Sequence, residues 1–344
     1  MIKVGVIGYG YWGPNLVRNF HQSGSTKLIG VSDIRQERLK EVTTRYPEVI
    51  VTANYKDLLN NPEVEAVVIA TPVETHYNIA KEALEAGKHV LVEKPLTNTV
   101  SEAKDLVKIA KEKGKTLMVD HTFLYLTETE KLKELVSSGE LGEIYTVSMQ
   151  RLSLGLFQRH INVIQDLIPH DIAILNYILG QKPITVNTSA AYACVGKGRG
   201  MEDTAHVVLQ YPNASIVTAH VSWVHPEKKR VLTIVGSKKM VVCDFENRNH
   251  PIMIYNKGAD NYQPFPPPNT AEQHNLVHYR DQEIVIPPVK GNGEALNSVA
   301  VEFAKAIKEN RKPKTDGEDG LAVVQVLDAA LQSMREGRKV EIKY

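Results

Sequence analysis

The chain has 344 residues, more than a single hydrophobic core usually organises, so two domains are expected. Its 41 lysines and arginines nearly balance its 40 aspartates and glutamates, which argues against nucleic-acid or anionic-membrane binding. No apolar run approaches the ~20 residues needed to span a bilayer, and no cationic leader precedes the first strand-like run, so a cytoplasmic location is expected.

Residues 1–122 alternate short β-branched runs with helical patterns. The strand-like runs are residues 2–7, 28–33, 65–71, 88–94 and 115–120. Such alternation predicts parallel strands with helical crossovers, and the continuous apolar character of the runs indicates a sheet covered on both faces. We therefore predict an α/β domain with a doubly wound parallel sheet, a Rossmann domain, over residues 1–122.

A glycine-rich segment, "GYGYWG", follows the first strand and opens a helix within a βαβ unit, which is the context of a dinucleotide-binding loop. Gly8 permits the tight turn, Gly10 lets the backbone approach the pyrophosphate, and Gly13 allows close helix–strand packing. The helix N-terminus would supply N–H donors to that pyrophosphate. The predicted cofactor contacts in this segment are Gly8, Gly10, Tyr11, Trp12 and Gly13. The alternative is a tight turn without a cofactor.

Asp33 ends the second strand and can accept hydrogen bonds from both adenosine ribose hydroxyls, which favours NAD over NADP. Arg35 lies two residues further on and is a candidate cofactor contact that would instead face a 2′-phosphate. NAD is therefore the expected cofactor, with NADP as the alternative.

Two further strand ends present polar residues where open α/β sheets bind ligands. The candidate cofactor contacts in "ATPVETH" are Thr71, Pro72 and His76, although a capped helix start explains them as well. In "VLVEKPL", the candidate cofactor contacts Glu93 and Lys94 precede Pro95, which disfavours helical geometry at Lys94 and permits a cis peptide bond. A plain solvated turn is the alternative.

Residues 123–344 have a different pattern, with helical segments and strand-like runs separated by turn residues. They predict an α+β domain with a large, mostly antiparallel sheet. The proline-rich stretch 263–282 is expected to be an extended loop. Cys194 and Cys243 lie in no metal-ligand spacing, so no metal site is expected, and both are predicted to be small buried residues.

Within "DLIPHD", Asp166 and His170 stand four residues apart and so share one helix face, whereas Asp171 points elsewhere. An Asp/His pair at this spacing is a surface pair in many proteins. The alternative interpretation of Asp166 and His170 is a catalytic pair, because imidazole titrates near neutral pH and accepts protons readily there.

Together, "GVIGYGYWG", Asp33, "ATPVETH", "EAGKHVLVEKPL" and "DLIPHD" resemble the glucose-fructose oxidoreductase and inositol dehydrogenase family, Gfo/Idh/MocA. The resemblance covers essentially the whole chain. It implies that Lys94, Asp166 and His170 meet at the nicotinamide, and that the exposed face of the second domain's sheet makes homodimers or homotetramers. The chain departs from many sugar and inositol dehydrogenases of the family at "VDHTFLY", where they carry an arginine.

The expected reaction is the NAD(P)-dependent oxidation of a CH–OH group. His170 or Lys94 takes the hydroxyl proton, Lys94 stabilises developing alkoxide charge, and Asp166 orients the pair. The expected substrate is a nucleotide-sugar such as a UDP-N-acetylhexosamine, oxidised at C3, with its diphosphate bound by Arg151, Lys228 and Arg230. A free sugar or inositol is one alternative, and a non-catalytic dinucleotide-binding regulatory protein is another.

Overall fold

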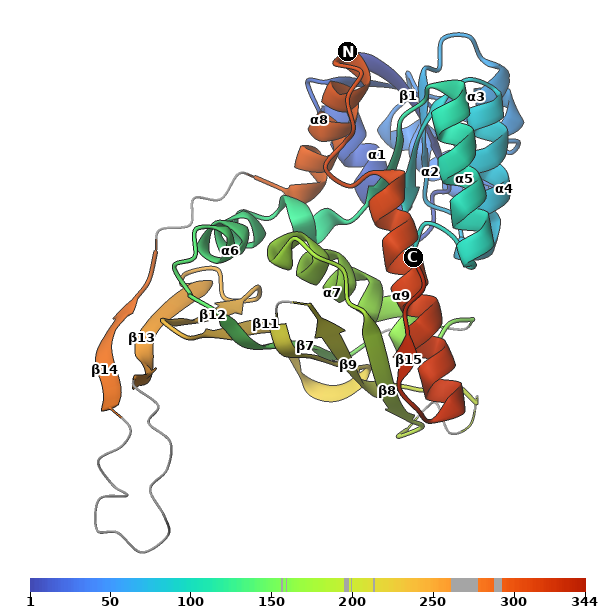
Figure 1. Ribbon diagram of the computed structural model, residues 1–344. Coiled ribbons are helices and arrows are strands. Elements are labelled where there is room, and N and C mark those ends of the chain that lie inside the picture. Colours follow the sequence, from blue (N-terminus) through green and yellow to red (C-terminus); the bar gives the residue numbers. More distant parts are fainter. Residues whose placement is uncertain are drawn as a thin grey trace, which may run out of the picture. The chain divides into compact units, whose positions relative to one another are not determined.

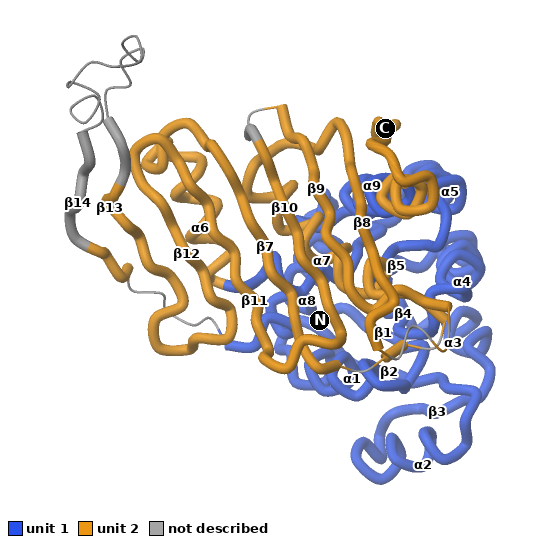
Figure 2. The backbone as a smooth tube through the Cα atoms, turned by 90° about the horizontal axis from the view of Figure 1, so that it is seen from below, with its two compact units in different colours: residues 1–126, 292–328, 344 blue, residues 127–291, 329–343 orange. Residues whose placement is uncertain are grey.

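The computed structural model describes residues 1–155, 157–158, 160–194, 198, 200–212, 214–260, 278–287 and 293–344. The chain divides into two compact units (Figure 2). Unit 1 comprises residues 1–126, 292–328 and 344, and unit 2 comprises residues 127–291 and 329–343. Among the described residues, no helix is both long enough and apolar enough to cross a membrane.

Unit 1 is built on a parallel sheet that lies within the continuously described residues 1–126 and has the strand order β3-β2-β1-β4-β5-β6. Helices pack along this sheet (Figure 1). The strands are β1 (Ile2–Ile7), β2 (Thr26–Ser32), β3 (Ile50–Thr52), β4 (Ala66–Ile69), β5 (His89–Glu93) and β6 (Leu117–Asp120). The helices between and after them are α1 (Gly13–Gln22), α2 (Gln36–Arg45), α3 (Lys56–Asn60), α4 (Val73–Glu85), α5 (Val100–Lys113) and the short 3-10 helix η1 (Thr122–Tyr125). This is the predicted doubly wound Rossmann topology, and the order reverses between β1 and β4, where such sheets bind ligands.

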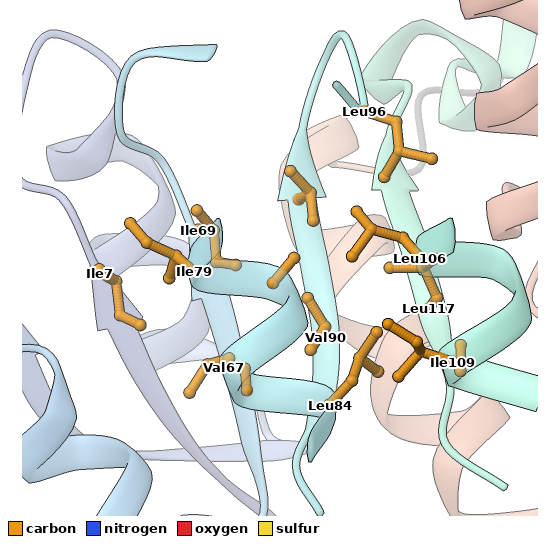
Figure 3. Packing of buried hydrophobic residues seen from close by; sticks show 14 of the residues in the cluster. Ile7, Val67, Ile69, Ile79, Leu84, Val90, Leu96, Leu106, Ile109 and Leu117 are labelled. Carbon is orange, nitrogen blue, oxygen red and sulfur yellow. The ribbon is translucent and has the colours of Figure 1, made fainter. Parts of the chain in front are cut away.

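Both faces of this sheet are buried by helices, which explains why its strands read as continuously apolar. On one face, Ile79 and Leu84 of α4 and Leu106 and Ile109 of α5 pack on strand residues such as Val90 (Figure 3). On the other face, α1 packs against α8 (Ala295–Lys308), where the rings of Phe20 and Phe303 meet edge to face at 6.5 Å. Each fully buried side chain of this size contributes about 1.5–3 kcal/mol.

The sequence analysis placed all of residues 123–344 in the second domain, but part of the C-terminal region belongs to unit 1. Helix α8 and much of α9 (Gly317–Glu336) belong to unit 1, because residues 293–328 pack with the Rossmann sheet and its helices. Phe303 and Val299 complete the core beside α1, and the Thr315 hydroxyl donates a hydrogen bond to the Val119 carbonyl at 2.7 Å. The amphipathic pattern of these helices predicts that one face of each is buried. It does not predict which of the two domains that face packs against.

Unit 2 contains, among its described residues, a nine-stranded sheet in the order β14-β13-β12-β11-β7-β10-β9-β8-β15. The strands are β7 (Ile144–Leu154), β8 (Thr185–Ala191), β9 (Thr204–Tyr211), β10 (Ala214–Ser222), β11 (Val224–Gly236), β12 (Met240–Asp244), β13 (Ile252–Asp260), β14 (His278–Val285) and β15 (Val340–Glu341). The helices α6 (Thr127–Ser137) and α7 (Val163–Leu179) also belong to this unit, as does the end of α9 from residue 329. Among the described strand pairs of this nine-stranded sheet, only β10–β7 is parallel, so the prediction of an α+β domain with a mostly antiparallel sheet is confirmed.

Two details of the second domain differ from expectation. The predicted loop over 263–282 lies outside the described residues as far as 277, and its last residues belong to strand β14, which pairs with β13. Cys243 is buried as predicted, but Cys194 is exposed. Cys194 follows β8 in a turn, where its backbone N–H donates to Asp203 Oδ2 at 2.9 Å. The turn geometry, and not burial of the thiol, therefore determines the position of Cys194.

Candidate active site

The glycine-rich loop leaves an open cradle at its centre. At Gly8, φ is +99° and an added Cβ would lie 2.6 Å from the Ala70 carbonyl oxygen, so only glycine fits this turn. At Gly13 an added Cβ would lie 2.4 Å from the Gly8 carbonyl oxygen, so glycine also permits the close packing of α1. At Gly10 the nearest atom to an added Cβ is Arg35 Nη2, at 3.8 Å. The backbone at Gly10 is therefore open beside the N-terminus of α1, which fits a pyrophosphate.

Asp33 lies beside this cradle, buried and strongly hydrogen bonded. Its Oδ2 accepts from the Tyr9 backbone N–H at 2.8 Å and from Arg35 Nη2 at 2.9 Å. Its Oδ1 accepts from the Arg35 backbone N–H and from Arg35 Nε, both at 2.9 Å. Burial favours a raised pKa, but the hydrogen bonds from Arg35 and Tyr9 outweigh it and hold the pKa of Asp33 below its usual value. A ribose hydroxyl that binds Asp33 must therefore displace the half-exposed Arg35 side chain.

Two predicted contacts of the glycine-rich segment are open to solvent. Tyr11 is 80% exposed and Trp12, which caps α1, is 38% exposed. Both side chains are accessible to a ligand.

His76 joins two strand ends rather than facing solvent. Its ring is buried, with Nδ1 3.0 Å from the Pro95 carbonyl oxygen and Nε2 2.9 Å from the Thr71 carbonyl oxygen. Burial lowers the pKa of His76, so the ring is neutral and donates to one of these carbonyls. The peptide bond between Lys94 and Pro95 is cis, as the sequence allowed. His76 thus links the ends of β4 and β5, while Pro72 is exposed at the start of α4.

Four polar residues gather at the carboxyl ends of β5 and β6, and sequence analysis identified only two of them. Glu93 and Asp120 are opposite each other in the β5–β6 register, and Lys94 and His121 follow them. Burial and the Lys94 charge lower the pKa of His121 to about 3, so this imidazole is neutral. Asp120 and His121 follow an apolar run, and the segment that contains them, "VDHTFLY", entered the sequence analysis only as a departure from the resemblance.

In unit 2, helix α7 carries the predicted Asp166 and His170. The helix begins at an Asn162 and Gln165 capping box, which places Asp166 in its first turn. Trp223 Nε1 donates to Asp166 Oδ2 at 3.1 Å. His170 follows one turn later on the same helix face, and both side chains are half-buried. Sequence analysis missed Trp223, which lies 57 residues away along the chain.

The three predicted substrate cations are all engaged in ion pairs. Arg151 is buried on β7, where its Nε lies 2.6 Å from Asp171 Oδ1. Arg230, opposite Arg151 in the β11–β7 register, contacts Glu246 at 3.0 Å, and Lys228 contacts the same carboxylate at 2.8 Å. Burial and Arg151 lower the pKa of Arg230 below its usual value. Arg151 therefore ties α7 to the sheet, whereas Lys228 and Arg230 are partly exposed.

A glycine cradle at a helix N-terminus, an acidic residue directly after β2 and polar groups at the ends of β4, β5 and β6 define a dinucleotide-dependent oxidoreductase. Family comparison agrees. Residues 2–121 match the NAD-binding Rossmann domain of the Gfo/Idh/MocA oxidoreductase family, and residues 133–342 match the C-terminal alpha/beta domain of the same family. The chain belongs to this family and is an NAD(P)-dependent oxidoreductase.

Several relatives span nearly the full chain. It is 26% identical to the NADP⁺-dependent scyllo-inositol 2-dehydrogenase IolW of Bacillus subtilis, over 100% of this chain and 96% of that protein. It is 27% identical to the UDP-N-acetylglucosamine 3-dehydrogenase of Acidithiobacillus ferrooxidans, over 96% of each. Levoglucosan dehydrogenase in complex with NADH and levoglucosan has the same fold, with a TM-score of 0.80 at 21% identity and full coverage of both chains.

Proposed function

We propose that the protein oxidises a secondary ring hydroxyl of a sugar-type substrate, with roles for Lys94, Asp166 and His170. The observation that carries this proposal is that Asp166 lies one helical turn from His170 on α7 and that its carboxylate accepts a hydrogen bond from Trp223. Bound nicotinamide supplies hydride acceptance. His170 takes the hydroxyl proton, Asp166 orients the imidazole, and the Lys94 ammonium stabilises negative charge that develops on the oxygen.

The cofactor in this proposal is NAD, bound through Asp33. Asp33→Ala is expected to weaken NAD binding by roughly 10- to 100-fold, because hydrogen bonds to a charged group contribute about 1.5–3 kcal/mol. NADP binding is expected to change less, since Asp33 repels a 2′-phosphate. Arg35→Ala is the comparison variant: because a ribose hydroxyl must displace the Arg35 side chain from Asp33, it should leave NAD affinity unchanged or tighter and weaken NADP. Fluorescence titration of NADH and NADPH measures both, and equal losses for the two cofactors in Asp33→Ala would contradict the assignment.

The substrate class in this proposal is a nucleotide-sugar, oxidised at C3 of an N-acetylhexosamine unit. The UDP-N-acetylglucosamine 3-dehydrogenase relative supports it, as do the partly exposed Lys228 and Arg230, which share a carboxylate that a diphosphate would replace. The inositol dehydrogenase relative and the present pairing of both cations with Glu246 favour the second candidate, a free cyclitol or sugar.

Steady-state oxidation of UDP-sugars, free hexoses and inositols with NAD, followed by NADH fluorescence, distinguishes the candidates. Arg230→Ala is expected to raise KM for the UDP-sugar by about 10-fold or more, because one charge-assisted hydrogen bond is lost. Lys229→Ala is the matched control, since Lys229 is the next residue on the strand and pairs with Glu227. If kcat/KM for inositol or glucose equals that for the UDP-sugar and is unaffected by Arg230→Ala, the substrate is a free polyol and not a nucleotide-sugar.

We propose that a homodimer or homotetramer forms through the face of the unit 2 sheet that carries Val208 and Ile216. These side chains are 41% and 50% exposed. On the same face His206 and His220 are stacked, with ring centroids 4.0 Å apart. An exposed apolar and aromatic sheet face of this kind supports association with a second copy. The oligomeric state stays a prediction, measurable by light scattering.

A further inference from the structure

Trp223 is the single residue between β10 and β11, and its indole reaches the first turn of α7. It is 3% exposed, and its Nε1–H donates to Asp166 Oδ2 at 3.1 Å. An indole N–H can only donate and an ionised carboxylate can only accept, so the two groups are complementary. Hydrogen bonds to a charged group are the stronger class, and burial of the indole keeps water from competing for its N–H. The bond therefore fixes the position of Asp166 Oδ2.

The indole is itself held in place by the Trp223 backbone and by a second ring. The Trp223 backbone N–H donates to the Asp203 carbonyl at 2.9 Å, and the Trp223 carbonyl accepts from the Gly155 N–H at 3.0 Å. The ring of Phe157 packs edge to face on the indole, with ring centroids 5.9 Å apart, which is a favoured geometry for aromatic pairs. The donor that binds Asp166 is therefore fixed before any ligand arrives.

The two residues before β9, Glu202 and Asp203, connect Trp223 to the start of α7. The Glu202 carbonyl accepts from the Val163 N–H at 3.1 Å, and Glu202 Oε2 accepts from Asn162 Nδ2 at 2.9 Å. Asn162 caps α7, and Val163 is its first residue. Asp203, which binds the Trp223 backbone, is 0% exposed. We call this dipeptide the 202–203 strap, because it binds the helix start through one residue and Trp223 through the next.

We propose that Trp223 is a positioning residue for Asp166, and that the 202–203 strap keeps the indole and the first turn of α7 together. Asp166, fixed in this way, orients His170 on the same helix face, so Trp223 contributes to turnover through these two residues. The kinetic consequence rests on the proposed function. The bond between the indole and the carboxylate does not, and it is measurable without any substrate.

The indole N–H resonance in nitrogen-15 NMR tests the bond directly. The chain has two tryptophans, so Trp12→Phe leaves the Trp223 indole as the only one. In that background, Asp166→Ala should move the resonance upfield and speed its hydrogen exchange by about 10-fold or more, because a hydrogen bond to a charged group is lost. Glu202→Ala should move the resonance in the same direction by less. Glu227→Ala, four residues from the indole along the chain, is the matched control and should leave it in place.

A double-mutant cycle tests the kinetic consequence. Trp223→Phe removes the Nε1–H and keeps an aromatic ring, and it should lower kcat by about 10-fold while KM and NADH affinity stay near normal. In Asp166→Ala, the same substitution should cost less than about 2-fold more, because its target is gone. A purely structural role would cost the same in both backgrounds. Tyr145→Phe, which removes a polar hydrogen from an exposed ring on β7, is the matched control and should be unchanged.

The resonance measurement keeps Trp223 in the chain, so it decides the proposal even if Trp223→Phe does not fold. An indole resonance that Asp166→Ala leaves in place, or equal losses of kcat in the two backgrounds, would overturn the positioning role. A resonance that Glu202→Ala leaves in place would remove the strap from the proposal. If the resonance moves as expected while no sugar is oxidised, only the proposed function fails.

Discussion

Replacement of Lys94 or His170 by alanine is expected to lower turnover by about 100-fold or more while NADH still binds. A positioned acid or base contributes on the order of 100- to 10,000-fold, and an electrostatic stabiliser a comparable amount. A 100-fold loss corresponds to about 2.7 kcal/mol of transition-state stabilisation. The measurement is kcat at saturating substrate, with NADH affinity by fluorescence on the same preparations.

The double variant tests whether the two residues serve one step. Groups that act as a unit are non-additive, so Lys94→Ala/His170→Ala should be little slower than the worse single variant. Lys104→Ala, at an exposed position on α5, is the matched control and should be unchanged. Near-normal kcat in either single variant would remove that residue from the catalytic assignment.

Replacement of Asp171 by alanine is expected to destabilise the protein by about 3–5 kcal/mol, because it leaves the buried Arg151 guanidinium without its carboxylate. Arg151 and Asp171 side chains are 5% and 1% exposed, so water cannot replace the lost partner. Denaturant unfolding followed by circular dichroism measures the change. A loss of this size would also show that the burial of Arg151 serves stability.

Two variants sharpen this result. Lys229→Met breaks the pair with Glu227, whose side chains are 38% and 66% exposed, and is expected to cost about 1 kcal/mol or less. Arg151→Met/Asp171→Leu replaces the buried pair by apolar groups of similar volume and should recover most of the stability. A cost for Asp171→Ala no larger than for Lys229→Met would show that the pair is unimportant to the fold.

The features that the sequence predicted correctly are those whose cause is local. Gly8 adopts a positive φ and Gly13 allows close packing because a turn between a strand and a helix requires both within a few residues. Asp166 and His170 share a helix face because of their spacing alone. The parallel sheet followed from alternating strand and helix patterns.

Only the tertiary structure decided which polar residues, distant in the chain, lie next to one another. Arg151 pairs with Asp171 and Trp223 holds Asp166 because strands and α7 meet there. Glu93 meets Asp120 because β5 and β6 are neighbours in register. Local patterns record which side chains are apolar or charged, but the energy of a buried charge depends on its partner, and partners 20 or more residues apart, as in each of these three pairs, are chosen by chain topology.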